Sequence, residues 1–290
     1  MQNDLLHQFL FENTPIRGNL VHLNDTYQNA LEHQSLPPVI KKALGELMAA
    51  SALLTSTLKM DGTLVLQIQN KGQLKLLVVE CSSDMGIRAT AKWDGDIADD
   101  ANFLDLIKSG HCIITLDPKA GEKYQGVVPI EGDSIAEMIE NYMSRSQQID
   151  TKLWLSCNGK KAAGMLLQKL PEHPTHDADA WNRIGLLANT VNDEELQSFS
   201  AEHLLNNLFN EEDVRLFEAK PIHFHCQCNR NGVASMLKML GESEVDSILS
   251  EQEKIEINCD YCNKQYAFDA IDVAAIFSDK MPHKAGKLVH

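Results

Sequence analysis

The pattern of apolar and polar positions in the first 170 residues predicts two helices and a mostly antiparallel sheet. Residues 37–60 repeat apolar side chains at helical spacing after a pair of prolines, and residues 133–146 do so around a Ser-x-x-Glu capping box. Six shorter runs have the length and flanking turn residues of strands. They are 63–69, 74–81, 86–93, 111–117, 124–130 and 152–157. Strands joined by short turns, with helices between them, favour an α/β (α+β) domain whose helices pack on the sheet.

A proline-containing break at residues 170–174 separates this domain from an acidic, helical stretch. Residues 179–190, 193–199 and 201–209 are expected to be helices, and their apolar positions are set among many Asp and Glu residues. Residues 176–220 carry a net charge of −7, almost half of the chain's −15. Because like charges repel, we expect these helices to need a partner surface; a solvated amphipathic connector is the alternative.

The chain is therefore predicted to divide into three parts. Residues 1–175 form an α/β core, residues 176–220 a metastable acidic linker, and residues 221–290 a small C-terminal module. With 290 residues, of which 43% are apolar and 23% charged, the chain has the size and composition of a globular protein of about two domains.

Charge and hydropathy narrow the classes of function. The excess of acidic residues, 41 against 26 basic ones, disfavours binding to nucleic acid or to anionic membranes, which both require a basic surface. The longest apolar-rich stretch, residues 43–58, is interrupted by polar residues and too short to span a bilayer. The N-terminal segment lacks the basic region of a signal peptide. We therefore expect a cytoplasmic protein, whose seven cysteines indicate metal binding or redox chemistry rather than permanent disulfides.

Four of the cysteines form two close pairs near the C-terminus. Cys226-x-Cys228 and Cys259-x-x-Cys262 are separated by 30 residues. Two such pairs at this distance are typical of a tetrahedral zinc site with four thiolate ligands. Four unrelated buried thiols are the alternative.

The other cysteines and two nearby histidines are not expected to be ligands. Cys81, Cys112 and Cys157 lie on strand-like runs among apolar neighbours, so we interpret them as inert core thiols. His223 and His225 alternate along a strand-like run and are expected to face solvent.

The predicted zinc site is closed and therefore structural or redox-sensitive rather than catalytic. Four thiolates leave no open position at which water could be activated. The sequence also lacks the HExxH, GxGxxG, GxxxxGK[ST] and GxSxG patterns, so we expect no enzyme and no catalytic residues. A module of about sixty residues is only marginally stable from its own core, whereas structural zinc contributes roughly 10–16 kcal/mol in small peptides. Loss of the metal, or oxidation of its thiolates, should unfold the module.

Several motifs together make the chain similar to the redox-regulated holdase chaperones of bacteria, the thirty-three-kilodalton heat-shock chaperonin family, over nearly its whole length. The most specific motifs are the CxC…CxxC spacing and the EVDSIL run at 244–249. Further matching runs are Arg17-Gly18, Leu44-Gly45-Glu46-Leu47, Val79-Glu80-Cys81, Arg88-Ala89-Thr90-Ala91, Tyr124-Gln125-Gly126-Val127-Val128, Glu131-Gly132-Asp133-Ser134, Arg145-Ser146-Gln147-Gln148, Ala162-Ala163-Gly164-Met165-Leu166-Leu167-Gln168 and Glu211-Glu212-Asp213-Val214-Arg215. Within these runs, Gln147-Gln148 replaces a Glu-Gln that is common in the family.

The resemblance implies a stress-response chaperone that is inactive when reduced and bound to one zinc ion through Cys226, Cys228, Cys259 and Cys262. Oxidation of these redox-active cysteines would form two disulfides, release zinc, unfold the module and loosen the linker. The oxidised protein would form a homodimer and hold unfolding or oxidatively damaged client proteins without ATP. Apolar linker residues that become exposed are the candidates to bind clients. They are Leu186, Leu187, Leu204, Leu205, Leu208 and Phe209.

Two other interpretations stay open. One is a zinc-ribbon module for protein interaction, in which the zinc is permanently structural and the thiols resist mild peroxide. The other is a thiol–disulfide oxidoreductase that uses Cys259 and Cys262. It is disfavoured because a second cysteine pair lies nearby and because Cys259 follows a strand-like run, 255–258, rather than opening a helix.

Overall fold

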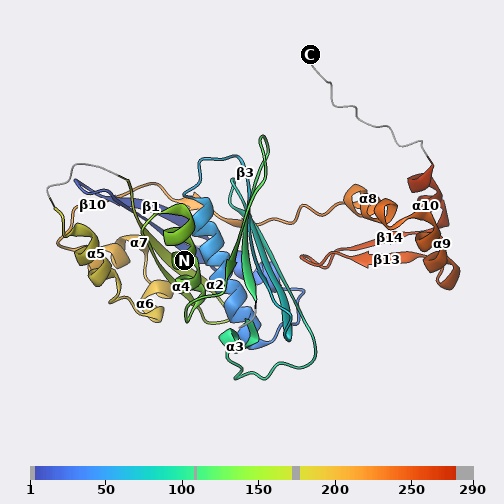
Figure 1. Ribbon diagram of the computed structural model, residues 1–290, viewed down its shortest axis with the longest axis horizontal. Helices are drawn as coiled ribbons and strands as arrows, with labels where there is room; N and C mark the ends of the chain where they lie inside the picture. Colours follow the sequence, from blue (N-terminus) through green and yellow to red (C-terminus); the bar gives the residue numbers. More distant parts are fainter. Residues whose placement is uncertain (1–3, 108–109, 172–176, 279–290) are drawn as a thin grey trace, which may run out of the picture. The chain divides into compact units, whose positions relative to one another are not determined.

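The computed structural model describes residues 4–107, 110–171 and 177–278 (Figure 1). These residues belong to two compact units, Met1–His225 and Cys226–His290. Each unit has apolar clusters of its own.

The larger unit contains two six-stranded sheets within the described residues. The first sheet has the order β10-β1-β2-β9-β8, with β11 also paired to β1. Its strands are β1 (Leu5–Phe11), β2 (Ile16–Leu23), β8 (Thr151–Cys157), β9 (Ala162–Lys169), β10 (Val214–Leu216) and β11 (Lys220–Pro221). The second sheet has the order β12-β5-β4-β3-β6-β7. Its strands are β3 (Gly62–Gln69), β4 (Leu74–Ser82), β5 (Gly86–Trp93), β6 (His111–Pro118), β7 (Tyr124–Pro129) and β12 (His223–Phe224). All pairs are antiparallel except β12 with β5.

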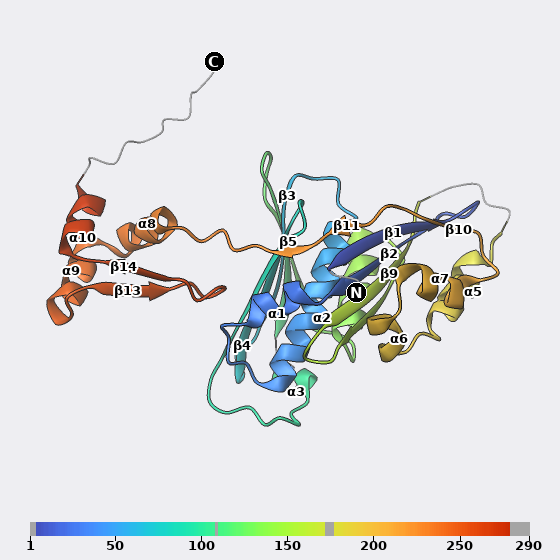
Figure 2. The same cartoon turned by 180° about the vertical axis from the view of Figure 1, so that it is seen from behind.

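Helix α2 (Pro38–Thr55) packs against strands of both sheets and forms the centre of this unit (Figure 2). Its side chains at helical spacing, among them Ile40, Leu44 and Leu47, are fully buried. The shorter helices α1 (Asp25–Leu31), α3 (Phe103–Ile107) and α4 (Ile135–Tyr142) surround it, and a π-helical turn, Met143–Gln147, continues α4. The sheets are therefore joined through one buried helix.

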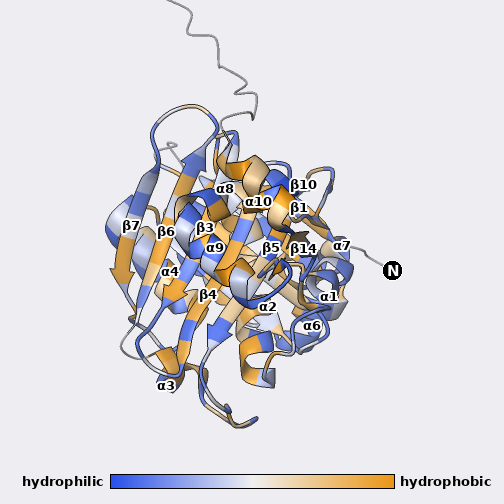
Figure 3. Cartoon of the chain, turned by 90° about the vertical axis from the view of Figure 1, so that its right-hand side faces the viewer, coloured by the Kyte–Doolittle hydropathy of each residue, from blue (hydrophilic) through white to orange (hydrophobic). Residues whose placement is uncertain are grey.

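The six strands that were predicted from run length and flanking turn residues are confirmed, and so are both helices, with shorter bounds. Figure 3 shows both hydrophobic and hydrophilic residues along β4 and β6, and more buried positions alternate with less buried ones in β3. Helix α2 ends at Thr55 rather than at residue 60. The hydroxyls of Ser56 and Thr57 donate to the carbonyls of Leu53 and Leu54 and so replace the helical bonds beyond this point. At the start of α4, Ser134 accepts the Glu137 amide as the capping box requires.

The sequence did not predict β1, β2 and β9, because these strands lack a clean alternation. In β2 and β9 nearly every residue is buried. The first sheet is covered by α2 on one face and by linker helices on the other, so neither face selects polar side chains. The expected single sheet is therefore two sheets.

The acidic stretch folds as three helices, as predicted, and these helices have a partner surface. They are α5 (Ala180–Ala188), α6 (Asp193–Ser198) and α7 (Ala201–Phe209). Their apolar side chains pack on the first sheet in a cluster separate from that around α2. Within it, the ring of Phe209 meets Phe11 edge-on at a centroid distance of 4.9 Å and lies 6.5 Å from Phe9. The linker is thus held by packing that is independent of the main core.

Polar groups of the larger unit also hold α6. Lys161 Nζ donates to the Gln197 carbonyl at 2.8 Å, and Gln197 Nε2 donates to Ser156 Oγ at 2.6 Å. The buried ring of His22 places Nε2 3.0 Å from the carbonyl of Leu196, so this nitrogen donates. Its Nδ1 is buried without a partner in the described residues.

Mild acid is expected to destabilise this part of the protein. Burial lowers the pKa of His22 to about 4, and this effect outweighs the hydrogen bond to Leu196, which raises the pKa. An exposed imidazole has a pKa of about 6.5. Between these values the unfolded state binds a proton that the folded state excludes, so stability falls as pH drops. We expect about 2 kcal/mol less stability at pH 5 than at pH 7 from His22 alone, with burial of His7 acting in the same direction.

Urea unfolding at the two pH values, followed by tryptophan fluorescence, measures this difference, because Trp154 and Trp181 pack against the linker cluster. The variant His22→Gln should lose most of the dependence. The exposed His33→Gln should keep it. Equal pH dependence in both variants would contradict the assignment.

The smaller unit has little core of its own. It consists of α8 (Arg230–Leu240), α9 (Glu242–Glu251), the hairpin β13 (Ile255–Asn258) and β14 (Gln265–Phe268), and α10 (Ala270–Phe277). Its fully buried apolar side chains are Ala234, Leu237, Val245, Ile255, Tyr266, Phe268, Val273 and Ile276. So small a core gives only marginal stability.

Candidate metal centre

Two tight segments of the smaller unit present the four cysteines. Cys259 and Cys262 lie in the turn between β13 and β14, which is closed by the Cys259 amide bonded to the Lys264 carbonyl at 3.0 Å. Asn263 adopts the left-handed conformation that this turn requires, with φ of 54°. Cys226 and Cys228 precede α8, whose first turn is capped by the side chain of the next residue, Asn229.

The four sulfurs form one compact cluster, as the spacing predicted. All lie within 4.8 Å of one another, with Cys226 Sγ 3.7 Å from Cys259 Sγ and Cys228 Sγ 3.4 Å from Cys262 Sγ. A tetrahedral ion with metal–sulfur bonds of ~2.3 Å would hold its sulfurs about 3.8 Å apart, whereas disulfide sulfurs are ~2.05 Å apart. The four cysteines are free, and their spacing fits thiolates around one metal ion.

The chemistry of the donors also fits a metal. Burial raises the pKa of Cys226 to about 12 and raises that of Cys262. At Cys228 burial acts in the same direction, but hydrogen bonds from Tyr266 and the neighbouring thiols outweigh it and lower the pKa to about 7. Of these three thiols Cys228 therefore ionises first, and a metal ion would have to displace protons from the others.

Tyr266 is a member of the site that the sequence analysis missed. Its side chain, on β14, is buried, and its hydroxyl donates to Cys228 Sγ at 3.1 Å. A hydrogen bond to a ligand sulfur is an outer contact of the kind that orients and tunes metal ligands. Nothing in the spacing of the cysteines identifies it, because the packing of β14 against the segment before α8 brings Tyr266 to Cys228.

The residues that were excluded as ligands are placed as expected. His223 and His225 are exposed, and the cluster of possible ligands in the described residues consists of the four cysteines alone. Cys81, Cys112 and Cys157 are buried. Burial raises the pKa of each of these thiols, to about 12 for Cys81 and Cys112, which keeps them protonated and unreactive.

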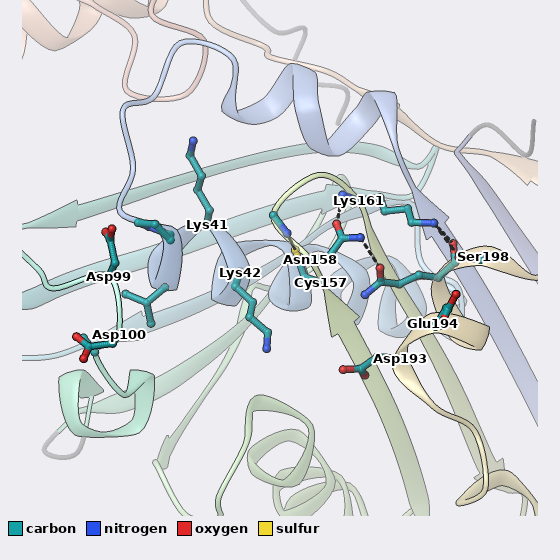
Figure 4. Close-up of a pocket in the computed structure, with 15 residues that line it drawn as sticks. Lys41, Lys42, Asp99, Asp100, Cys157, Asn158, Lys161, Asp193, Glu194 and Ser198 are labelled. Carbon is teal, nitrogen blue, oxygen red and sulfur yellow. Dashed lines mark hydrogen bonds between the residues drawn. The ribbon is translucent and has the colours of Figure 1, made fainter.

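A groove with a volume of about 950 Å³ lies between the core and α6 (Figure 4). Its side chains carry both signs of charge, such as Lys42 and Asp193. Asn158 donates to Gln197, and Lys161 donates to the Gln197 carbonyl and Ser198. These polar groups thus tie the linker to the turn between β8 and β9.

The six apolar linker candidates differ in exposure. Leu204, Leu205, Leu208 and Phe209 are buried against the first sheet, and Leu187 is partly buried, whereas Leu186 is 68% exposed. Their role in binding clients stays a prediction.

None of the described helices is long and apolar enough to cross a membrane.

Comparison with known proteins gives one consistent family. A family model described as Hsp33 protein matches residues 4–269. A 33 kDa chaperonin of Methylobacillus flagellatus is 59% identical over 282 residues, which cover 96% of each chain. A 33 kDa chaperonin of Chromobacterium violaceum is 47% identical and covers 95% of this chain and 94% of its own. In fold, the crystal structure of a 33 kDa chaperonin from Thermotoga maritima is similar, with a TM-score of 0.83, 20% identity, and coverage of 95% and 98%.

Proposed function

The chain belongs to the Hsp33 family, and from this premise we propose that it is a cytoplasmic, ATP-independent holdase switched on by oxidation of a four-cysteine zinc centre. Its relatives are named chaperonins, which supports a chaperone rather than an enzyme. The observation that carries the switch is the cluster of four free thiols in a unit with a small core.

Zinc is the ion that best suits the cluster. Cys226, Cys228, Cys259 and Cys262 would hold it in a tetrahedral, closed arrangement of soft donors. Bound there, it would join the segment before α8 to the β13–β14 turn. Because the unit's own core is marginal, that link supplies a large part of its stability.

Oxidation would remove the ligands. When two thiolates form a disulfide, they lose two electrons and no longer donate to a metal. Formation of two disulfides therefore releases four electrons. Two molecules of hydrogen peroxide accept these electrons, together with four protons, and form water. Pairing within Cys226-x-Cys228 and within Cys259-x-x-Cys262 closes only short loops. It leaves the two segments untied, so the smaller unit would unfold.

Unfolding of the smaller unit would then loosen the acidic linker, residues 176–220, from the core, residues 1–175. The apolar side chains of α5, α6 and α7, together with the face of the first sheet beneath them, would become available to unfolded clients. Leu204, Leu205, Leu208 and Phe209 are the candidates that gain most exposure, and Leu186 and Leu187 extend the surface. Homodimer formation would bury part of the released surface, and the surrounding acids would keep a complex soluble.

The test is zinc stoichiometry before and after peroxide, with far-UV circular dichroism and aggregation of a denatured client measured on the same samples. We expect one zinc per reduced chain, its release with loss of ordered structure, and suppression of aggregation by the oxidised form only. If zinc resists peroxide and the module stays folded, the permanently structural alternative, an interaction module, replaces this proposal. Reduction of insulin by the protein would instead indicate an oxidoreductase.

Tyr266→Phe is expected to weaken zinc binding without preventing folding in excess metal. The change removes only the hydroxyl that donates to Cys228 Sγ and keeps the buried ring. Loss of such an outer hydrogen bond typically lowers metal affinity 10- to 100-fold. Competition with a colorimetric chelator measures the affinity, and Tyr261→Phe, in the turn itself, serves as the comparison. Equal affinity of the Tyr266 variant and the parent chain would contradict this role.

A further inference from the structure

Residues 214–225, which we call the strap, cover the open edges of both sheets in the larger unit. Strands β10 and β11 pair with β1 at one edge of the first sheet, and β12 pairs with β5 at one edge of the second. Figure 2 shows this segment running past β1 and β5. Without the strap, β1 and β5 would be edge strands with unpaired backbone groups, and such edges are templates for another extended chain.

Backbone hydrogen bonds hold the strap on both edges. The amide of Phe217 donates to the Gln8 carbonyl at 2.9 Å, in line with the antiparallel register of β10 on β1. On the other sheet, the amides of His223 and His225 donate to the carbonyls of Met85 and Ile87 at 3.2 and 3.0 Å. These contacts use main-chain atoms, so they would accept any sequence that can lie extended.

The side chains of the strap indicate which kinds of side chain can pack beside the edge strands β1 and β5. Ile222 is buried in the core around α2, and Phe224 packs against the same core. Val214 and Leu216 pack against the linker cluster, whereas Arg215 between them is exposed. Each edge therefore receives apolar side chains at alternate positions, which is the pattern of an unfolded segment prone to form strands.

The strap makes only short strand pairings, and it includes the end of the linker, residues 176–220, and the start of the predicted C-terminal module, residues 221–290. Its strands are three, two and two residues long, whereas β1 has seven and β5 has eight. It follows α7 along the chain and ends at the residue before Cys226. A longer client segment could form more backbone bonds on the same edges than the strap does.

On the basis of the proposed function, we propose that the activated protein binds its clients by strand addition on β1 and β5, where the strap pairs in the inactive protein. The occupant is an extended segment of an unfolded protein with apolar side chains at alternate positions. Backbone pairing supplies affinity without selecting a sequence, which suits a chaperone that holds many clients.

Three synthetic peptides of residues 214–225 test the proposal on the oxidised full-length protein. The first is unmodified. The second is N-methylated at Phe217 and His223, whose amides point to β1 and β5. The third is N-methylated at Leu216 and Phe224, whose amides point away because strand neighbours alternate. The side chains are the same in all three, so only the backbone donors differ.

Competition against a fluorescent unfolded client and hydrogen exchange give the readouts. We expect the first and third peptides to displace the client at least tenfold better than the second. Client and first peptide should both slow exchange in Leu5–Phe11 and Gly86–Trp93 while leaving the interior strand Gly62–Gln69 unchanged. Equal competition by all three peptides, no competition, or unchanged exchange at both edges would overturn strand addition while aggregation is still suppressed. Failure of the oxidised protein to suppress aggregation would instead overturn the proposed function and this inference with it.

Discussion

Cys259→Ser is expected to abolish zinc binding and to unfold the smaller unit without any oxidant. The substitution removes one of four sulfurs that lie within 4.8 Å of one another, and a serine hydroxyl is a poor replacement for a thiolate. Zinc binding in comparable small modules contributes roughly 10–16 kcal/mol. Among the described residues, eight buried apolar side chains form the core of this unit, and so small a core does not stabilise the fold to a comparable extent.

Metal analysis and hydrogen exchange over residues 230–277 measure both effects on the reduced protein. Asp260→Ser is the matched control, because Asp260 is exposed in the same turn, between the two ligands. It should retain zinc and slow exchange. Exchange in α2 should be the same in both variants, since the larger unit has its own core. If Cys259→Ser kept its zinc or its slow exchange, the metal would not be what holds the unit folded.

Phe209→Ala is expected to release the linker while the zinc centre stays reduced and loaded. Phe209 is 2% exposed and packs on Phe9 and Phe11. Truncation of a buried phenylalanine costs about 3–5 kcal/mol, which corresponds to a shift of more than about 100-fold in the docking equilibrium. The loss falls on the linker because its apolar cluster is separate from the core around α2.

The reduced variant should bind more apolar dye than the parent chain and should suppress aggregation of a client without peroxide. Asn207→Ala is the control, since Asn207 lies on the same helix as Phe209, α7, but is exposed. It should behave like the parent chain in both assays. A reduced Phe209→Ala protein with unchanged dye binding and unchanged exchange in α7 would show that the linker does not depend on this contact.

The cysteine cluster and most strands of the second sheet were predictable because their signals are local. The two cysteines of each pair are close along the chain, and their spacing predicted one cluster of four sulfurs, which could hold a metal ion. In β3 and β7 more buried positions alternate with less buried ones, and the sequence shows this difference between the two faces of a strand. The acidic helices were also predictable, because their apolar stripes recur at helical spacing.

The sequence by itself therefore determined the two cysteine pairs, the acidic helices and most strands of the second sheet, since each depends on residues that are close along the chain. Tertiary structure alone decided the burial of β2 and β9, the contact of Tyr266 with Cys228, and the path of the strap along two sheet edges. In these cases the partners are distant in sequence. Their burial and pairing depend on which surfaces pack together, and the local periodicity of the sequence does not indicate these contacts.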